Sequence, residues 1–211
     1  MRKKERALHL IACLERDYPD ALCSLAYPKD YELLFTVRLA AQCTDERVNK
    51  IAPALFARFP TLAAFAAGPV EDVERLVHST GFYRAKARDI VAAARMLIAD
   101  YGGKVPDTME ELLKLPGVGR KTANLILGDI YNAPGAVVVD THCIRITNRM
   151  GLVDTKDPAK IETELRKILP PDKSNDFCHR LVLHGRAVCT ARKAKCEICS
   201  CAPYCKHFTN T

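Results

Sequence analysis

The chain has 211 residues, 48% of them hydrophobic and 27% charged, which is enough for one large domain or two small ones with substantial cores. No apolar run approaches the roughly 20 residues that a membrane-spanning helix needs, which excludes an integral membrane protein. The formal net charge of +7 indicates a polyanionic partner only weakly.

The first residues imitate a signal peptide, because basic residues precede an apolar run. His9 interrupts that run, and Glu15 to Asp17 stand where small cleavage-site residues belong. We therefore expect an amphipathic first helix and, with no targeting segment, a cytoplasmic protein.

Apolar periodicity and capping residues predict further helices along almost the whole chain. Their expected ranges are 31–42, 45–58, a short helix opened by Thr61, 70–77, 83–100, one capped by Asp107 with Glu110 as a capping box, 120–131, 140–151, 158–169 and 174–188. Ala136 to Val139 is the only β-leaning run, and one run cannot form a sheet. We expect an all-α protein in which this run is a buried, extended crossover between two helical halves.

A glycine-hinged turn, Leu115-Pro-Gly-Val-Gly119, joins two of the expected helices. Gly117 and Gly119 allow a sharp turn and a close approach of the backbone to a ligand. Their amides, together with the N-terminus of the next helix, predict a site for one phosphate, which fixes register without reading sequence. A helix–helix turn that binds nothing is the alternative.

Lys121 lies at the start of the helix after this turn. A phosphate-binding lysine is the simplest interpretation, but a neutral lysine amine is also a nucleophile, and a helix N-terminus favours the neutral form. Asp140 follows the buried crossover and supplies a carboxylate from a different segment, although it can equally serve as a helix cap.

Four cysteines near the C-terminus, Cys189, Cys196, Cys199 and Cys205, are separated by gaps of six, two and five residues. Four thiolates held together need a cation or cluster, and zinc and an iron–sulfur cluster are the chemical candidates. One short gap within a compact loop favours a 4Fe–4S cluster over zinc, whose ribbons use two Cys-x-x-Cys pairs. Cys201 is either a spare thiol or a competing ligand. Between Cys178 and His207 six Lys or Arg face one acid, a local basic surface typical of phosphate-backbone binding.

Taken together, these motifs resemble the endonuclease III family of helix–hairpin–helix DNA glycosylases. The resemblance rests on residues 115–124, Val139-Asp-Thr-His142, Ala41-Gln-Cys-Thr-Asp45 and the cysteine loop, and it covers nearly the whole chain in order. It implies a six-helix domain at 23–135 and a discontinuous iron–sulfur domain at 1–22 and 136–211, flanking a DNA-binding groove. It also implies a monomer that acts on damaged double-stranded DNA, associated with the nucleoid.

The resemblance further implies roles for single residues. Lys121 would form a Schiff base at C1′ of a flipped nucleotide, Asp140 would assist base departure, and β-elimination would cut the strand at oxidised pyrimidines or abasic sites. The residues that would contact DNA are Gln42, which would fill the space of the flipped base, Thr80, Phe82, Gly117, Val118, Gly119, Arg120 and His142.

Some positions depart from the family pattern or have a simpler interpretation. Phe82 stands where the family usually has an aliphatic wedge, so we expect an altered opposite-base preference. Cys43 and Cys143 are more simply small buried hydrophobes, and His142 is equally well a structural histidine. A monofunctional adenine- or mismatch-type glycosylase and a non-enzymatic DNA-binding iron–sulfur protein remain as alternative functions.

Overall fold

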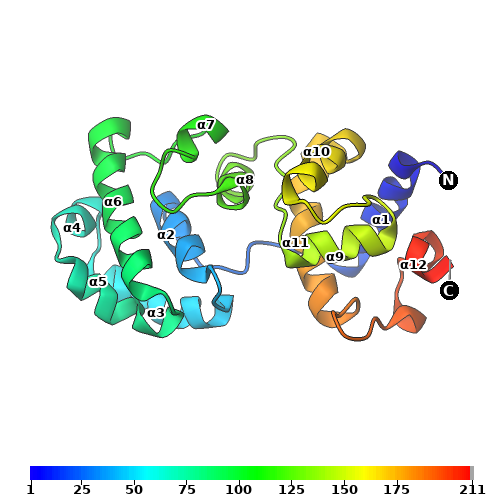
Figure 1. Ribbon diagram of the computed structural model, residues 1–211, viewed down its shortest axis with the longest axis horizontal. Coiled ribbons are helices and arrows are strands. Elements are labelled where there is room, and N and C mark those ends of the chain that lie inside the picture. Colours follow the sequence, from blue (N-terminus) through cyan, green and yellow to red (C-terminus); the bar gives the residue numbers. More distant parts are fainter. Residues whose placement is uncertain (210–211) are drawn as a thin grey trace. The chain divides into compact units, whose positions relative to one another are not determined.

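The computed structural model describes residues 1–209 and divides the chain into two compact units (Figure 1). The central unit is Ser24–Tyr131, and the terminal unit joins Met1–Cys23 to the segment from Asn132 onward. No strand forms within residues 1–209, where the only extended pairing is an isolated bridge between Cys189 and Ala194. The prediction of an all-α chain is confirmed. None of the described helices is long and apolar enough to cross a membrane.

The central unit is built from helices that pack around aromatic side chains. Its helices are α2 (Asp30–Ala40), α3 (Asp45–Arg58), α4 (Leu62–Ala67), α5 (Val70–Val77), η1 (His78–Thr80), α6 (Tyr83–Tyr101), α7 (Met109–Leu112) and α8 (Arg120–Asp129). Helix α6 packs against α4 and α5. The ring of Phe65 lies 5.0 Å from that of Phe35 and 4.9 Å from that of Phe59, centroid to centroid, so the core joins α2, α4 and the end of α3.

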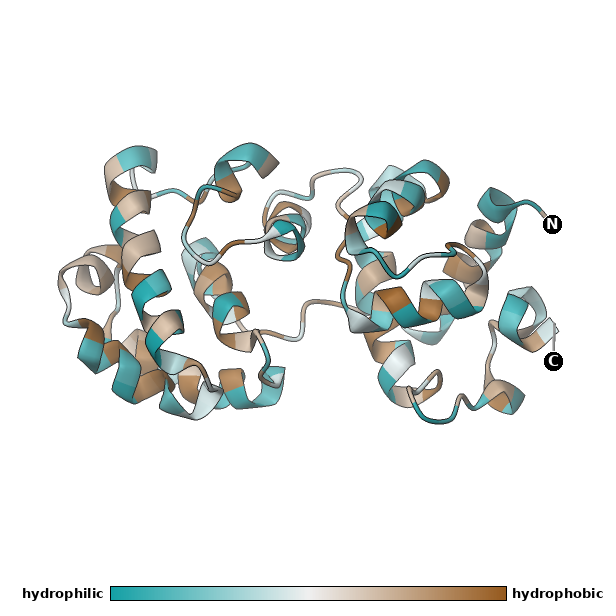
Figure 2. Ribbon diagram, viewed as in Figure 1, coloured by the Kyte–Doolittle hydropathy of each residue, from teal (hydrophilic) through white to brown (hydrophobic). Residues whose placement is uncertain are grey.

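The terminal unit assembles the first helix with the last third of the chain. Its helices are α1 (Lys3–Asp17), α9 (Thr141–Met150), α10 (Pro158–Ile168), η2 (Pro171–Lys173), α11 (Ser174–Ala187), η3 (Cys196–Ile198), η4 (Ala202–Tyr204) and α12 (Lys206–Thr209). Helix α11 packs against both α1 and α9. On α1 the buried residues Ala7, Leu10, Ile11 and Leu14 recur every three or four positions, which confirms the amphipathic first helix. Figure 2 shows this alternation of hydrophilic and hydrophobic residues along the helices.

Side-chain caps mark several of the predicted helix starts. Thr44, Thr61 and Asp157 each accept a hydrogen bond from a backbone amide two or three residues further on. The predicted capping box of Asp107 with Glu110 is wrong, because Thr108 is the N-cap and accepts from the amide of Glu111. The threonine begins the helix one residue later, and α7 then lasts only four residues before the hairpin.

Candidate active site and metal centre

The predicted hairpin forms between α7 and α8. Gly117 has φ of +75°, a left-handed conformation that glycine adopts at little cost, and the amide of Val118 donates to the carbonyl of Leu115 at 3.1 Å. Gly119 is the N-cap of α8, so no N-cap side chain covers the first amides of this helix. The hairpin therefore offers backbone donors and the positive end of a helix dipole to an anion.

Lys121 is the second residue of α8 and its side chain is exposed. Arg120 beside it is also exposed. Backbone amides without a side-chain cap and a primary amine thus stand within one helical turn of each other, an arrangement in which an amine lies beside an anion-binding position.

An ion pair lies directly beneath the hairpin. The guanidinium of Arg38, on α2, donates to Oδ2 of Asp89, on α6, through both Nε and Nη2 at 2.7 Å. A Cβ atom at Gly117 would stand 2.6 Å from Nε of Arg38 and 2.8 Å from Oδ2 of Asp89. The absence of a side chain at Gly117 therefore lets the hairpin rest on this pair. Sequence reasoning missed both partners, because neither belongs to a motif.

Gln42 and Phe82 share an unusual backbone conformation in the same unit. Their φ angles are +55° and +48°, in the left-handed region that side chains rarely adopt, and both residues are exposed. Phe82 exposes 70% of its surface, which is exceptional for a large aromatic residue. Strained, exposed residues at loop tips are frequent at ligand-binding positions.

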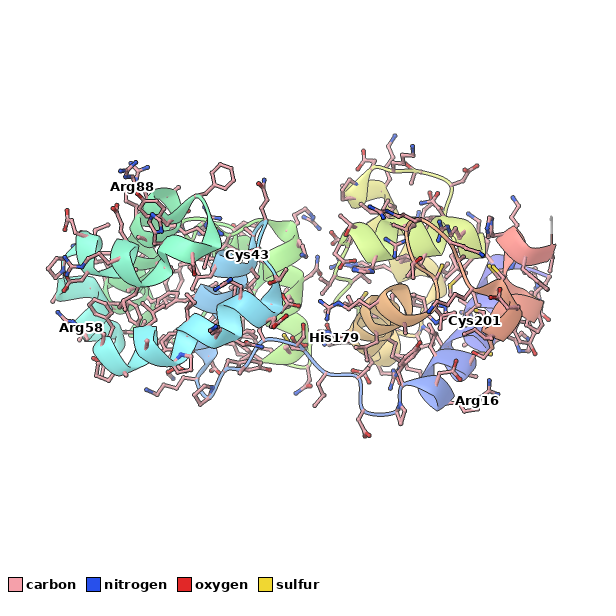
Figure 3. All side chains as sticks on the ribbon, turned by 90° about the horizontal axis from the view of Figure 1, so that it is seen from below. Arg16, Cys43, Arg58, Arg88, His179 and Cys201 are labelled. Carbon is pink, nitrogen blue, oxygen red and sulfur yellow. The ribbon has the colours of Figure 1, made fainter. Side chains whose placement is uncertain are left out.

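Thr80 differs from these two neighbours, because its side chain is buried and its hydroxyl donates to the carbonyl of Val77 at 2.8 Å. The structure gives that hydroxyl an internal role in the loop before Phe82. Cys43, labelled in Figure 3, lies half-buried on the turn after α2.

Asp140 belongs to the terminal unit and is the N-cap of α9. The run from Ala136 to Val139 that precedes it is buried and forms neither helix nor strand, as predicted for the crossover. Oδ1 of Asp140 accepts from the amide of Cys143 at 2.7 Å, and the residue is half-buried. The alternative role as a helix cap is therefore present in the structure, and one capping oxygen leaves the carboxylate's charge available to a ligand.

Two residues next to Asp140 are packed into the terminal unit. Nδ1 of His142 lies 3.2 Å from Nη2 of Arg145, and a Cβ atom at Gly185 would stand 2.3 Å from that ring nitrogen. Cys143 is buried beside Cys178, and the hydrogen bond between the two thiols, together with burial, raises the pKa of Cys143 well above its ordinary value. Both thiols behave as small core residues, as the simpler interpretation of Cys143 expects.

The cysteine loop surrounds a hollow of about 360 Å³, which includes its solvent-open mouth. The side chains that line it include the four predicted cysteines Cys189, Cys196, Cys199 and Cys205, together with Cys201, His184 and Arg149. Arg149, on α9, holds the start of the loop: its guanidinium donates to the carbonyl of Thr190 at 2.7 Å and to that of Ala191 at 3.2 Å, and lies 3.4 Å from Sγ of Cys189. The positive charge of Arg149 therefore lies beside cysteines that would be negatively charged as thiolates.

Among residues 1–209, His184, Cys199 and Cys201 form a candidate metal-binding group, because their donor atoms lie within 4.8 Å of one another. A hydrogen bond from the thiol of Cys201, followed by contacts with His184, lowers the pKa of Cys199 to about 4. Cys201 is itself buried, and its pKa is raised by the same hydrogen bond and by burial. The lowered pKa favours the thiolate form of Cys199, which is the form in which cysteine binds a metal.

The donor set fits a thiophilic metal centre, because several sulfur atoms line one hollow beside a cationic side chain. His184 is the residue that sequence reasoning missed. It lies on α11 five positions before Cys189, and its carbonyl accepts from the amides of both Val188 and Cys189. The sequence does place a histidine shortly before the cysteine loop. Its position on a helix, however, does not tell whether the side chain binds a metal or packs in the core.

Comparison with known proteins gives these features a common context. Residues 37–171 match the HhH-GPD superfamily base excision DNA repair proteins. Endonuclease III of Synechocystis sp. is 47% identical over 203 residues, covering 96% of this chain and 93% of that protein, and endonuclease III of Escherichia coli K12 is 36% identical over 97% of this chain and 96% of its own length. A structure of a trapped endonuclease III–DNA covalent intermediate superposes with a TM-score of 0.92 at 37% identity, covering 100% of this chain and 99% of that one. The chain belongs to the endonuclease III family within the HhH-GPD superfamily of base excision DNA repair proteins.

Proposed function

We propose that this protein is a bifunctional DNA glycosylase that removes oxidised or damaged pyrimidines from double-stranded DNA and then cleaves the strand by β-elimination. The observation that carries the proposal is the exposed amine of Lys121 on the first turn of α8, directly after a hairpin whose amides can hold a phosphate. A DNA glycosylase without a lyase step needs only the phosphate-binding amides of the hairpin, whereas a lyase also needs an amine nucleophile at the start of α8.

In the proposed reaction the damaged nucleotide leaves the duplex, because a stacked base shields C1′ from attack. The lone pair of the Lys121 amine forms a bond to C1′, and the base departs with the electron pair of the glycosidic bond and takes up a proton. The sugar ring then opens to an iminium ion. Loss of a proton from C2′ moves electrons toward the iminium and breaks the C3′–O bond, which cuts the strand on the 3′ side.

Asp140 is the proposed carboxylate of this reaction. It caps α9 with one oxygen, so its position is fixed by the backbone amide of Cys143 and not by a lysine. A fixed negative charge near the sugar stabilises the positive charge that develops at C1′ as the base leaves. It would do so without holding the Lys121 amine in a tight ion pair, which would suppress its nucleophilicity.

The DNA contacts are proposed for both units. Gln42 and Phe82 would enter the duplex around the flipped nucleotide, with Gln42 filling the vacated space and Phe82 stacking between bases. Residues 117–120 would hold one phosphate, and the exposed basic residues of the cysteine loop, among them Arg192 and Lys193, would attract the backbone. The central unit is thus the proposed hairpin domain and the terminal unit the proposed iron–sulfur domain of a monomeric enzyme.

A 4Fe–4S cluster held by Cys189, Cys196, Cys199 and Cys205 is the proposed cofactor. The four cysteines line one hollow, but they do not form a close group of the kind that a single ion gathers within residues 1–209. Wider spacing suits a cluster, whose cysteines bind separate iron atoms, better than one zinc ion. When bound, the cluster would cross-link the basic loop and so order its phosphate-binding surface.

Two alternative functions are not favoured. A monofunctional adenine-type glycosylase does not need the lysine at position 121, and a DNA-binding iron–sulfur protein without activity needs neither that exposed amine nor the carboxylate of Asp140. Duplexes that carry thymine glycol, uracil, an abasic site or an adenine mismatch separate these functions. We expect base release and strand cleavage with thymine glycol, cleavage at the abasic site, and neither reaction at the mismatch; release of adenine without cleavage would refute the proposal.

A further inference from the structure

Lys86, on the first turn of α6, is buried to 1% exposure although it carries an ionisable amine. Its ammonium donates to two backbone carbonyls, that of Leu39 at 2.8 Å and that of Thr80 at 2.8 Å. Burial lowers the pKa of Lys86, as expected for an amine removed from water. A leucine or methionine would fill the same space without that desolvation cost, so the hydrogen bonds are what the amine adds.

The two carbonyls belong to different segments of the central unit. Leu39 is in the last turn of α2, three residues before Gln42, and Thr80 ends η1, two residues before Phe82. Helical carbonyls in a last turn lack intrahelical amide partners and carry the negative end of the helix dipole, which suits a cation there. One ammonium therefore links the starting points of two separate loops.

Those loops end in the two exposed residues with left-handed backbones, Gln42 and Phe82. Such conformations are unfavourable for residues with a side chain and persist only where the surrounding structure determines them. Each loop has its own local bonds, such as the hydroxyl of Thr80 on the carbonyl of Val77, but the Lys86 ammonium bonds to both segments at once. It is thus placed to set the distance between the two loop tips.

We propose that Lys86 is a positioning residue for base flipping: by holding Leu39 and Thr80 it fixes the spacing at which Gln42 and Phe82 enter the duplex. The inference rests on the proposed glycosylase function. It assigns Lys86 no contact with DNA and no proton transfer, because its side chain is buried. What it controls is the step that opens the stack, before Lys121 acts.

The test replaces Lys86 with methionine, which keeps the length and apolar stem but removes both donors. We expect single-turnover excision of thymine glycol from a duplex to fall at least tenfold, and the fluorescence rise of 2-aminopurine next to the lesion, which reports unstacking, to shrink in parallel. Cleavage at an abasic site in a single-stranded oligonucleotide, where no stacked duplex has to open, should stay within threefold of the unchanged protein. A general loss of folding would lower all three alike.

Lys104→Met is the matched control, because Lys104 is an exposed lysine of the same unit that follows the C-terminal end of α6, whereas Phe82 caps the N-terminal end of that helix. It should change none of the three readouts beyond twofold. Lys86→Gln, which keeps an amide donor on a shorter stem, should show the same split at smaller size and carries the test if Lys86→Met does not fold. Unchanged duplex excision in the variants, or equal losses on duplex and single strand, would overturn the inference. If the unchanged protein neither excises bases nor cleaves abasic sites, the proposed function itself has failed.

Discussion

Replacing Gly117 with alanine tests how the hairpin is built. The alanine would keep φ of +75°, which costs about 1–2 kcal/mol for a residue with a side chain. Its Cβ would also lie 2.6 Å from Nε of Arg38, so the ion pair with Asp89 has to move. That pair, whose side chains are 23% and 28% exposed, contributes about 1 kcal/mol or less. We therefore expect Gly117→Ala to lower the free energy of unfolding by roughly 1–3 kcal/mol.

Gly119→Ala is the control within the same hairpin. Gly119 has φ of −108°, and a Cβ atom there would meet nothing within 4 Å, so only the poorer helix cap costs free energy, about 0.5 kcal/mol. Urea unfolding followed by circular dichroism measures both variants. Because an added Cβ at Gly119 stands among the proposed phosphate-binding amides, that variant should bind duplex DNA several-fold more weakly while remaining stable. Equal stabilities for the two variants would refute the account of the hairpin.

Further predictions concern the carboxylate and the metal centre. Asp140→Asn keeps a good helix cap but removes the charge, so the free energy of unfolding should change by less than about 0.5 kcal/mol. The rate of base excision should fall at least a hundredfold, which corresponds to about 2.7 kcal/mol of transition-state stabilisation. Asp157→Asn, the same change at the cap of α10, should alter neither the stability nor the rate. Removing the proposed cluster with an iron chelator under oxidising conditions should bleach the visible absorption of the protein and weaken its binding to DNA. Arg149→Leu should lower bound iron, because the start of the cysteine loop loses its bonds to that guanidinium; undiminished iron would contradict this role.

The helices could be predicted from the sequence wherever a local signal decides the structure. Thr61 opens a helix as expected, and Thr44 and Asp157 cap the helices that begin at the predicted positions 45 and 158, because a short polar side chain before an apolar period is a sufficient signal. The signal failed at Asp107, where the adjacent Thr108 offers the same chemistry one residue later. Competing caps differ by tenths of a kcal/mol, which the surrounding packing decides.

The hairpin glycines with Lys121 and the four spaced cysteines could be recognised in the sequence, because the residues of each motif lie close together in the chain. The residues that hold these motifs in place could not be recognised. The pair of Arg38 with Asp89 spans 51 positions, and the bond from Lys86 to Leu39 spans 47. His184 lies on α11, outside the cysteine loop, and its side chain approaches Cys199 and Cys201 of that loop. Such contacts depend on how helices pack, and a single sequence carries no local mark of them.

The central claim is that the Lys121 amine forms a covalent bond with the sugar. Sodium borohydride reduces an iminium to a stable amine, so incubation of the protein with duplex DNA containing thymine glycol and borohydride should give a protein–DNA adduct that survives denaturing electrophoresis. Lys121→Ala should form none, although it still binds the duplex, and Lys104→Met should form as much as the unchanged protein. An adduct of undiminished yield with Lys121→Ala would contradict the assignment.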